Sequence, residues 1–99
     1  MSKEVIAKKN DVFRQTFIGG KVLLTAGVQE SEGLQEVIKA VQRFDDFTPD
    51  NNPYGERDFG KVTVNGEEYF FKIDYYDDNY EHFKEDGNRV LTIMRTDEY

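Results

Sequence analysis

The stretch FGKVTVNGEEYFFKIDYY, residues 59–76, constrains the fold of this chain more than any other part of the sequence. Asn65 and Gly66 separate two runs rich in β-branched and aromatic residues, a pattern typical of a β-hairpin closed by a two-residue type I′ turn. Such a turn also predicts the register of the two strands. The expected opposite pairs are Val64 with Glu67, Val62 with Tyr69, and Gly60 with Phe71.

The two faces of this hairpin differ, because side chains alternate along a strand. One face is expected to form core, through Val62, Val64, Tyr69, Phe71, Ile73 and Tyr75. The opposite face mixes aromatic and charged side chains, including Phe59, Phe70, Tyr76 and Asp74. That composition fits either a position under a helix edge or a binding surface.

Two other stretches have the 3.6-residue period of amphipathic helices. Residues 3–16 predict the first helix. Its apolar side is expected to carry Val5, Ile6, Val12 and Phe13, and Phe17, just after the helix, continues the same period. Its polar side is expected to carry Lys3, Lys8, Lys9 and Arg14. Residues 31–45 predict the second helix, with Ser31 as N-cap and a one-sided stripe of Leu34, Val37, Ile38, Val41 and Phe44.

Short apolar runs at 21–25 and 89–95 predict two more strands, and the first of these is expected to end at Ala26-Gly27. The resulting order, α-β-α-β-β-β, predicts an α+β fold in which two helices pack on one face of a mainly antiparallel four-stranded sheet. A chain of 99 residues without a repeat or linker is expected to form a single domain over residues 1–99.

Composition excludes several classes of protein. The chain has no cysteine, which rules out disulfides, thiolate catalysis and cysteine-ligated zinc. No stretch approaches the length of a membrane span and the amino terminus lacks the apolar run of a signal peptide, so we expect a cytoplasmic protein without membrane contact. The net charge is −7, and residues 45–86 hold four Lys and Arg against thirteen Asp and Glu.

The segment FDDFTPDNNPYGERDFG, residues 44–60, is too rich in Pro and Gly for a helix or strand, and its Asp, Asn, Pro and Gly suit turns. Its acids also suggest a calcium loop, because Asp50, Asn52 and Gly55 match positions one, three and six of an EF-hand. Tyr54 and Lys61 fail positions five and twelve. A small Ca²⁺- or Mg²⁺-binding module, or a hydrolase, could use Asp50, Asn52, Glu56 and Asp58.

A partner-binding surface is the other interpretation of this acidic region. Aromatic side chains interleaved with carboxylates make interface anchors with electrostatic specificity, and ordered carboxylates can imitate a phosphate backbone. The candidate partner-binding residues are Asp45, Asp46, Asp50, Glu56, Asp58, Asp74, Tyr76, Asp77, Asp78 and Glu81. We expect no catalytic residue, cofactor or direct nucleic-acid contact, because the single histidine, His82, lacks a triad partner and the basic helix lacks aromatic interleaving.

Several segments together resemble a domain-of-unknown-function family of small bacterial proteins. They are TAGV (25–28), FDDFTPDNNPYGERDFG (44–60), FFKIDYYD (70–77) and RVLTIM (89–94), with Glu98-Tyr99 at the end, and the resemblance runs from about Asn10 to Tyr99. The family is frequent on plasmids and in phage-related regions. The resemblance implies no catalytic residue, but it implies a mobile element, where small acidic proteins often act against DNA-targeting defences.

Three functions follow as expectations. The first is a non-catalytic acidic protein that docks on a basic surface of a host protein or nucleoprotein complex. It would inhibit a nucleic-acid-targeting defence of the CRISPR or restriction type, with DNA mimicry as one mechanism. The alternative is the metal-binding module or hydrolase built on the 45–58 loop. The third is a structural or regulatory partner of another plasmid protein, without mimicry.

Overall fold

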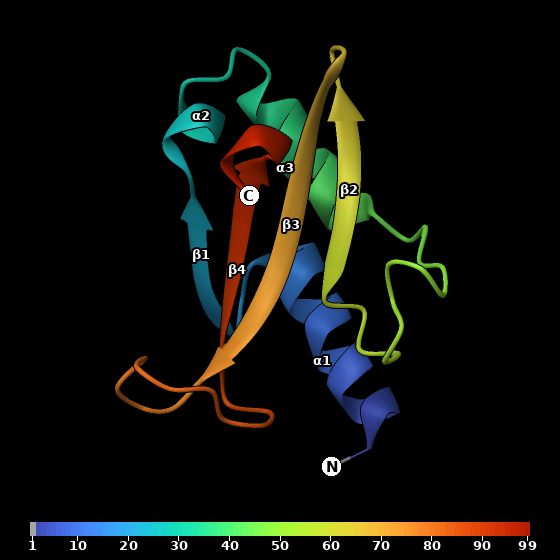
Figure 1. Ribbon diagram of the computed structural model, residues 1–99, viewed down its shortest axis with the longest axis vertical. Coiled ribbons are helices and arrows are strands. Elements are labelled where there is room, and N and C mark those ends of the chain that lie inside the picture. The colour runs from blue at the N-terminus through green and yellow to red at the C-terminus, as the bar shows by residue number, and fades with distance from the viewer. Residues whose placement is uncertain (1) are drawn as a thin grey trace.

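The computed structural model describes residues 2–99 and has an α+β fold, as the element order predicted. Four strands form one sheet in the order β1-β4-β3-β2, and two helices, α1 and α3, cover one of its faces (Figure 1). The strands are β1 (Gly20–Leu24), β2 (Phe59–Val64), β3 (Glu67–Tyr76) and β4 (Asn88–Arg95). The helices are α1 (Lys3–Thr16), α2 (Ala26–Gln29), α3 (Leu34–Arg43) and the 3₁₀ turn η1 (Thr96–Glu98). Among residues 2–99, no helix combines the length and apolar character needed to cross a bilayer.

The hairpin of β2 and β3 has the predicted register. Asn65 and Gly66 both have positive φ, 53° and 80°, which is the requirement of a type I′ turn. The three predicted opposite pairs are all present, and the predicted apolar face packs into the core beneath the helices. On that face Tyr69, Phe71, Ile73 and Tyr75 are buried, whereas Val62 and Val64 are partly buried at the sheet edge.

The sheet is mixed. Two of its three strand pairs are antiparallel, as expected for a mainly antiparallel sheet, and the third pair is parallel. The β2–β3 and β3–β4 pairs are antiparallel, but β1 runs parallel to β4, with Val22 beside Leu91. The apolar run of β1 predicts a strand without specifying its neighbour. The long connection through α2 and α3 carries the chain from β1 to β2 at the opposite edge of the sheet, and the antiparallel strands β2, β3 and β4 then bring the chain back beside β1 in the same direction as β1.

The helices also differ in detail from the prediction. A short helix, α2, follows Thr25 where a break was expected, and the carboxylate of Glu98 holds its start by accepting the Gly27 N–H and the Thr25 hydroxyl. The predicted N-cap of the next helix is wrong, since α3 begins after Gly33. The Ser31 hydroxyl instead hydrogen-bonds the Tyr69 hydroxyl on the sheet, at 2.9 Å.

Helix α1 has the predicted limits but a different buried face. It buries Ile6, Ala7, Asn10, Phe13 and Arg14, whereas Val5 and Val12 are exposed. Arg14 was expected on the polar face and is fully buried. Its burial is possible because Asp11 accepts its Nη1 donor at 2.8 Å and its guanidinium lies over the ring of Phe47, with Cζ 5.3 Å from the centroid.

The segment between α3 and β2 folds back on the core through its aromatic residues. Phe44 is buried and its ring lies edge-on to Phe71, with 5.2 Å between centroids. The Phe47 ring contacts two guanidinium groups, because that of Arg57 lies 4.1 Å from its centroid in addition to that of Arg14. Asp11 accepts from both arginines, so a single carboxylate joins α1 to this loop.

Gly60 offers a test of this packing. A Cβ atom at Gly60 would lie 2.5 Å from ring carbons of both Phe44 and Phe71. We therefore expect Gly60→Ala to lower the free energy of unfolding by about 2 kcal/mol in urea denaturation, the range typical of overpacking. Thr63→Ala, at an exposed position of the same strand, is the control and should change stability by less than about 0.5 kcal/mol. Equal stability of the two variants would contradict the described position of the rings.

Candidate functional site

An acidic hollow of about 500 Å³ opens where β3 ends and the segment 77–88 folds back on it. Two short contacts close this segment, since Asp77 N–H donates to the His82 carbonyl and Lys84 N–H donates to that of Tyr75. The hollow therefore has contributions from the loop before β2, from β3 and from this returning segment. Its lining includes five carboxylates and three aromatic side chains. The carboxylates are Glu56, Asp58, Asp74, Glu85 and Asp86, and the aromatic residues are Tyr75, Tyr76 and Phe83.

Tyr75 connects the wall of the hollow to α1. Its hydroxyl donates to Glu56 Oε1 at 2.8 Å and accepts from Asn10 Nδ2 at 2.8 Å. The same Asn10 amide group also donates to the main-chain oxygen of Glu56, at 2.9 Å. Burial is the largest cause that raises the pKa of Tyr75, so the hydroxyl stays protonated and can donate to Glu56 throughout the physiological range.

A second group of polar side chains connects Asp86 of the hollow to α1. Asn10 Oδ1 accepts from Arg89 Nε at 2.6 Å, and Arg89 Nη2 donates to Asp86 Oδ1 at 2.6 Å. Asp86 also accepts from Lys9 Nζ at 2.9 Å, and this bond is the main cause of its lowered pKa. The negative charge of Asp86 is therefore largely compensated within the protein.

Asp58, in contrast, has no such compensating cation within residues 2–99. Among residues 2–99 no salt bridge reaches it, and its pKa is raised above the usual 3.8. Partial burial is the largest cause, a backbone hydrogen bond of Asp58 itself opposes it, and the charges of Glu56 and Asp74 add to it. A cation placed in the hollow would relieve this repulsion, since an opposite charge within a few ångströms favours the ionised form.

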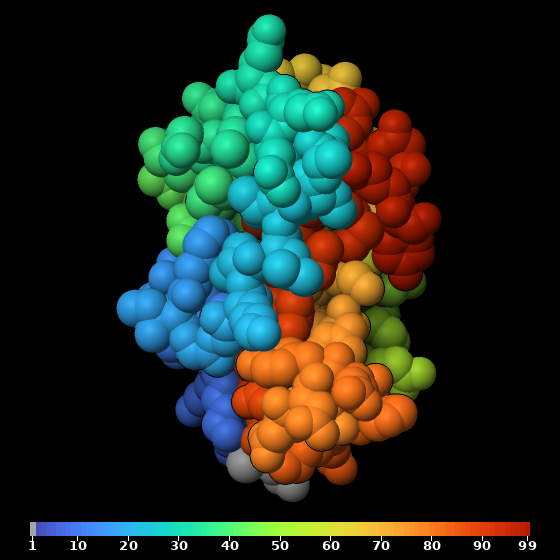
Figure 2. Space-filling view, turned by 90° about the vertical axis from the view of Figure 1, so that its left-hand side faces the viewer, coloured from blue at the N-terminus to red at the C-terminus, as the bar shows by residue number. Residues whose placement is uncertain are grey.

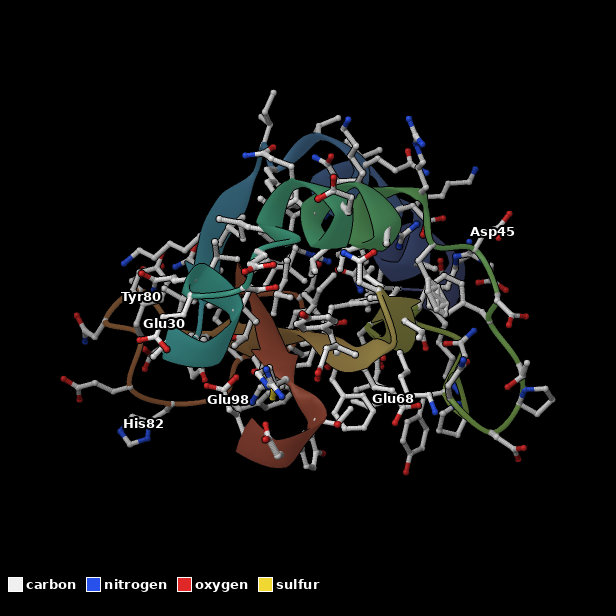
Figure 3. All side chains as sticks on the ribbon, turned by 90° about the horizontal axis from the view of Figure 1, so that it is seen from above. Glu30, Asp45, Glu68, Tyr80, His82 and Glu98 are labelled. Atoms are coloured by element: carbon white, nitrogen blue, oxygen red, sulfur yellow. The ribbon has the colours of Figure 1, made fainter. Side chains whose placement is uncertain are left out.

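Four of the ten residues predicted to bind a partner line the hollow, namely Glu56, Asp58, Asp74 and Tyr76. The other six lie elsewhere. Asp45, Asp46 and Asp50 are exposed on the loop after α3, and the labelled Asp45 lies on the opposite side of the molecule from Tyr80 and His82 (Figure 3).

The remaining predicted residues belong to the segment after β3. Asp77 Oδ1 accepts the N–H groups of Asn79 and Glu81, at 3.1 Å each, and Asp78 Oδ1 accepts from Asn88 at 3.4 Å. These are turn-building contacts. Glu81 is exposed.

Sequence reasoning missed Phe83, Glu85 and Asp86, which line the hollow from the returning segment. They lie in a polar stretch that was interpreted only as a connection. An available signal was the single large apolar residue in that stretch, Phe83, whose ring lies 6.3 Å from that of Tyr75.

The proposed metal ligands are not arranged around a common point. Asp50 is exposed, Asn52 Oδ1 accepts the Arg57 N–H, and Glu56 accepts the Tyr75 hydroxyl. Within residues 2–99, no three His, Asp or Glu side chains come close enough together to hold a metal ion. The chemistry that this arrangement favours is the binding of an organic cation between carboxylates and aromatic rings.

Comparison with known proteins supplies the family. Residues 24–98 match the family described as "Protein of unknown function (DUF3768)", which covers most of the chain. The chain belongs to this family. This membership confirms the expected relation to a family of proteins of unknown function, and the matched residues include every carboxylate of the acidic hollow. No curated protein and no solved structure matches the chain.

Tyr75→Phe tests the link between α1 and the hollow. The change removes the donor to Glu56 and an acceptor of Asn10, so we expect the free energy of unfolding in urea to fall by about 1–2 kcal/mol. Tyr54→Phe is the matched control, because Tyr54 is 70% exposed, and it should change stability by less than about 0.5 kcal/mol. A neutral Tyr75→Phe variant would show that the hydroxyl is not paired in solution.

Asp58→Asn tests the electrostatics of the hollow. Because the pKa of Asp58 is raised on folding, the folded state binds this proton more tightly, and ionisation reduces stability as the pH rises above about 3.8. We expect the variant to melt at a higher temperature than the parent protein at pH 7, with the difference disappearing near pH 3.

The control for this prediction is Asp50→Asn, the same chemical change on the exposed loop. It should leave the melting temperature nearly unchanged at both pH values. A lower melting temperature of Asp58→Asn at pH 7 would mean that the ionised carboxylate stabilises the fold.

Proposed function

We propose that the chain is a non-catalytic binding protein whose acidic hollow receives a lysine or arginine side chain from a basic surface of a partner protein. The observation that carries this proposal is the set of five carboxylates around one hollow, in which Asp58 has a raised pKa and no salt bridge within residues 2–99. Glu85, at the rim, also has no salt bridge within residues 2–99. An incoming guanidinium would satisfy both charges.

The aromatic walls support the same kind of ligand. Phe83 is 73% exposed and its ring lies near Tyr75, and Tyr76 is half-buried beside it in the lining. An exposed aromatic ring next to carboxylates provides a face for a cation and an apolar anchor for its methylene stem.

The class of partner is a finer part of the proposal. A net charge of −7, in a family that resembles mobile-element proteins, supports an inhibitor of a nucleic-acid-targeting host defence, of the CRISPR or restriction type. Such machines have basic grooves that an acidic protein could occupy. Asp45 and the segment around Tyr80 lie on opposite sides (Figure 3), which favours local capture of a cationic side chain over extended DNA mimicry.

The experiment compares two variants that lose the same charge. Asp58→Asn/Glu85→Gln removes two carboxylates of the hollow, and Asp45→Asn/Asp46→Asn removes two from the exposed loop. We measure binding of an acetylated nona-arginine peptide by calorimetry at about 50 mM and about 300 mM NaCl. We expect the hollow variant to lose at least about tenfold in affinity at either salt concentration and the loop variant less than about threefold.

Two results would contradict the proposal. Equal losses in the two variants would mean that net charge alone attracts the peptide, and no loss in either would remove the hollow from consideration. For the finer proposal, excess protein should reduce DNA binding by a CRISPR effector or restriction enzyme, and Asp58→Asn/Glu85→Gln should restore it. Unhindered DNA binding would exclude the tested machine as the target.

A hydrolase remains a second candidate because of the unlike environments of two carboxylates. Glu56 accepts a hydrogen bond from Tyr75, whereas burial raises the pKa of Asp58. Such a pair suits a general base and a general acid. A panel of chromogenic phosphate, glycoside and ester substrates tests it: turnover that persists in EDTA and disappears in Asp58→Asn would favour this candidate over binding alone.

A further inference from the structure

The edge strand β1 has backbone groups available for pairing with another strand. It is the terminal strand of the sheet, and within the described residues 2–99 its one neighbouring strand is β4. The Thr25 N–H donates to Ile93 of β4, whereas the carbonyl of Leu24 points away from the sheet and accepts from the Gln29 side chain at 2.6 Å. Since backbone groups alternate sides along a strand, those of Gly20 and Val22 also point outward. No hydrogen bond to them from that side is found within residues 2–99.

Two hollows adjoin this edge, one on each face of the sheet. On the helix side, a hollow of about 370 Å³, here called the basic hollow, is lined by Lys8, Lys9, Val12, Phe13, Ile18, Gly19 and Arg89. On the uncovered side, a hollow of about 320 Å³ includes Lys21, Leu23 and Tyr80. Ile18 and Leu23 are 75% and 52% exposed. Figure 2 looks onto this edge and shows β1 at the surface between the end of α1 and α2, above the 77–88 segment.

The charge at this edge is opposite to that of the rest of the protein. Within residues 2–99 no carboxylate lines the basic hollow, whereas three cations do. Asp86 pairs with both Lys9 and Arg89, whereas Lys8, which also lines the hollow, forms no salt bridge within residues 2–99. On a protein of net charge −7, this location attracts anionic groups.

Lysine on an edge strand commonly blocks the approach of another strand, but Lys21 is turned aside. Its Nζ lies 3.8 Å from the centroid of the Tyr80 ring on the uncovered face, away from the outward backbone groups. The opposite edge, β2, differs because Lys61 in its middle is exposed and pairs with Glu68 at 2.9 Å. The β1 edge is therefore the more receptive of the two.

We propose that the β1 edge binds an extended segment of a partner protein in which apolar and acidic residues alternate, added as a fifth strand. Its main chain pairs with the outward groups of Gly20 and Val22. Alternate side chains enter the basic hollow, where carboxylates meet Lys8, and the apolar set covers Leu23 on the other face. This site adjoins the acidic hollow through the Asp86 ion pairs but takes a ligand of opposite charge, and it does not depend on the proposed function.

The test uses the blocked peptide acetyl-EVEVEVE-amide as probe, with acetyl-KVKVKVK-amide as charge control. Strand addition should slow amide hydrogen exchange of Gly20 and Val22 at least tenfold. The amide of Leu23, which already faces β4, should change by less than twofold. This period of two distinguishes strand addition from any contact made by side chains alone.

Val22→Pro removes one outward N–H and leaves the bonds to β4 in place, so it should weaken binding of the acidic peptide at least tenfold. The matched control is Thr63→Pro. The main-chain carbonyl of Asp58 accepts the Ile73 N–H, so the backbone groups of Asp58 point toward β3. Because these groups alternate sides from one residue to the next, the N–H of Thr63, five residues on, points outward at the β2 edge. Lys8→Glu, a surface change, provides a second variant in case Val22→Pro does not fold, and it should weaken binding at least fivefold.

The proposal is overturned if the acidic peptide fails to slow exchange at Gly20 and Val22, or if the basic peptide binds equally well. It is also overturned if Lys8→Glu and a folded Val22→Pro both bind as the parent protein does. A dimer in sedimentation velocity that Val22→Pro dissociates would likewise overturn it, since the occupant would then be a second copy of the chain.

Discussion

The structure depends on two polar side chains that α1 buries completely, Asn10 and Arg14. A buried polar group without a partner costs about 1–3 kcal/mol, so each of them determines what must lie beside it. Asn10 bonds to Tyr75 of β3 and to Arg89 of β4, which holds the helix across two strands. Arg14 bonds to Asp11 and lies over aromatic rings, although its Nε has no partner within residues 2–99. These contacts orient α1 more specifically than apolar packing alone could.

The acidic hollow follows from the same contacts. Asn10 holds the main chain at Glu56 and the hydroxyl of Tyr75, and these fix the loop that presents Asp58. A carboxylate on a mobile loop would relax into water and away from its neighbours, whereas Asp58 is held in place, and its burial first and the charges of Glu56 and Asp74 second raise its pKa. The protein therefore retains unrelieved negative charge at a defined position, the property that a binding site for a cation requires.

Local patterns predicted the parts of the fold that depend on neighbouring residues. The limits of α1 and the register of the hairpin were both predicted, because a helical period and an Asn65-Gly66 turn act over a few residues. The candidate site was predicted in part: Glu56 and Asp58 were recognised from the density of acids, but Asp86 was not. Carboxylates more than twenty residues apart in sequence meet only because the segment after β3 folds back on its own strand.

The sequence by itself determined the α+β composition, the hairpin, its core face and the concentration of acids between residues 45 and 86, since each is a property of composition or short-range period. Tertiary structure decided that β1 pairs in parallel with β4 and that Arg14 is buried. It also decided which four of the ten predicted partner-binding residues line one hollow. The physical reason is that strand pairing and buried ion pairs join residues far apart in the chain. Whether a charged side chain is buried or exposed depends on the partner it meets there, as Asp11 shows for Arg14.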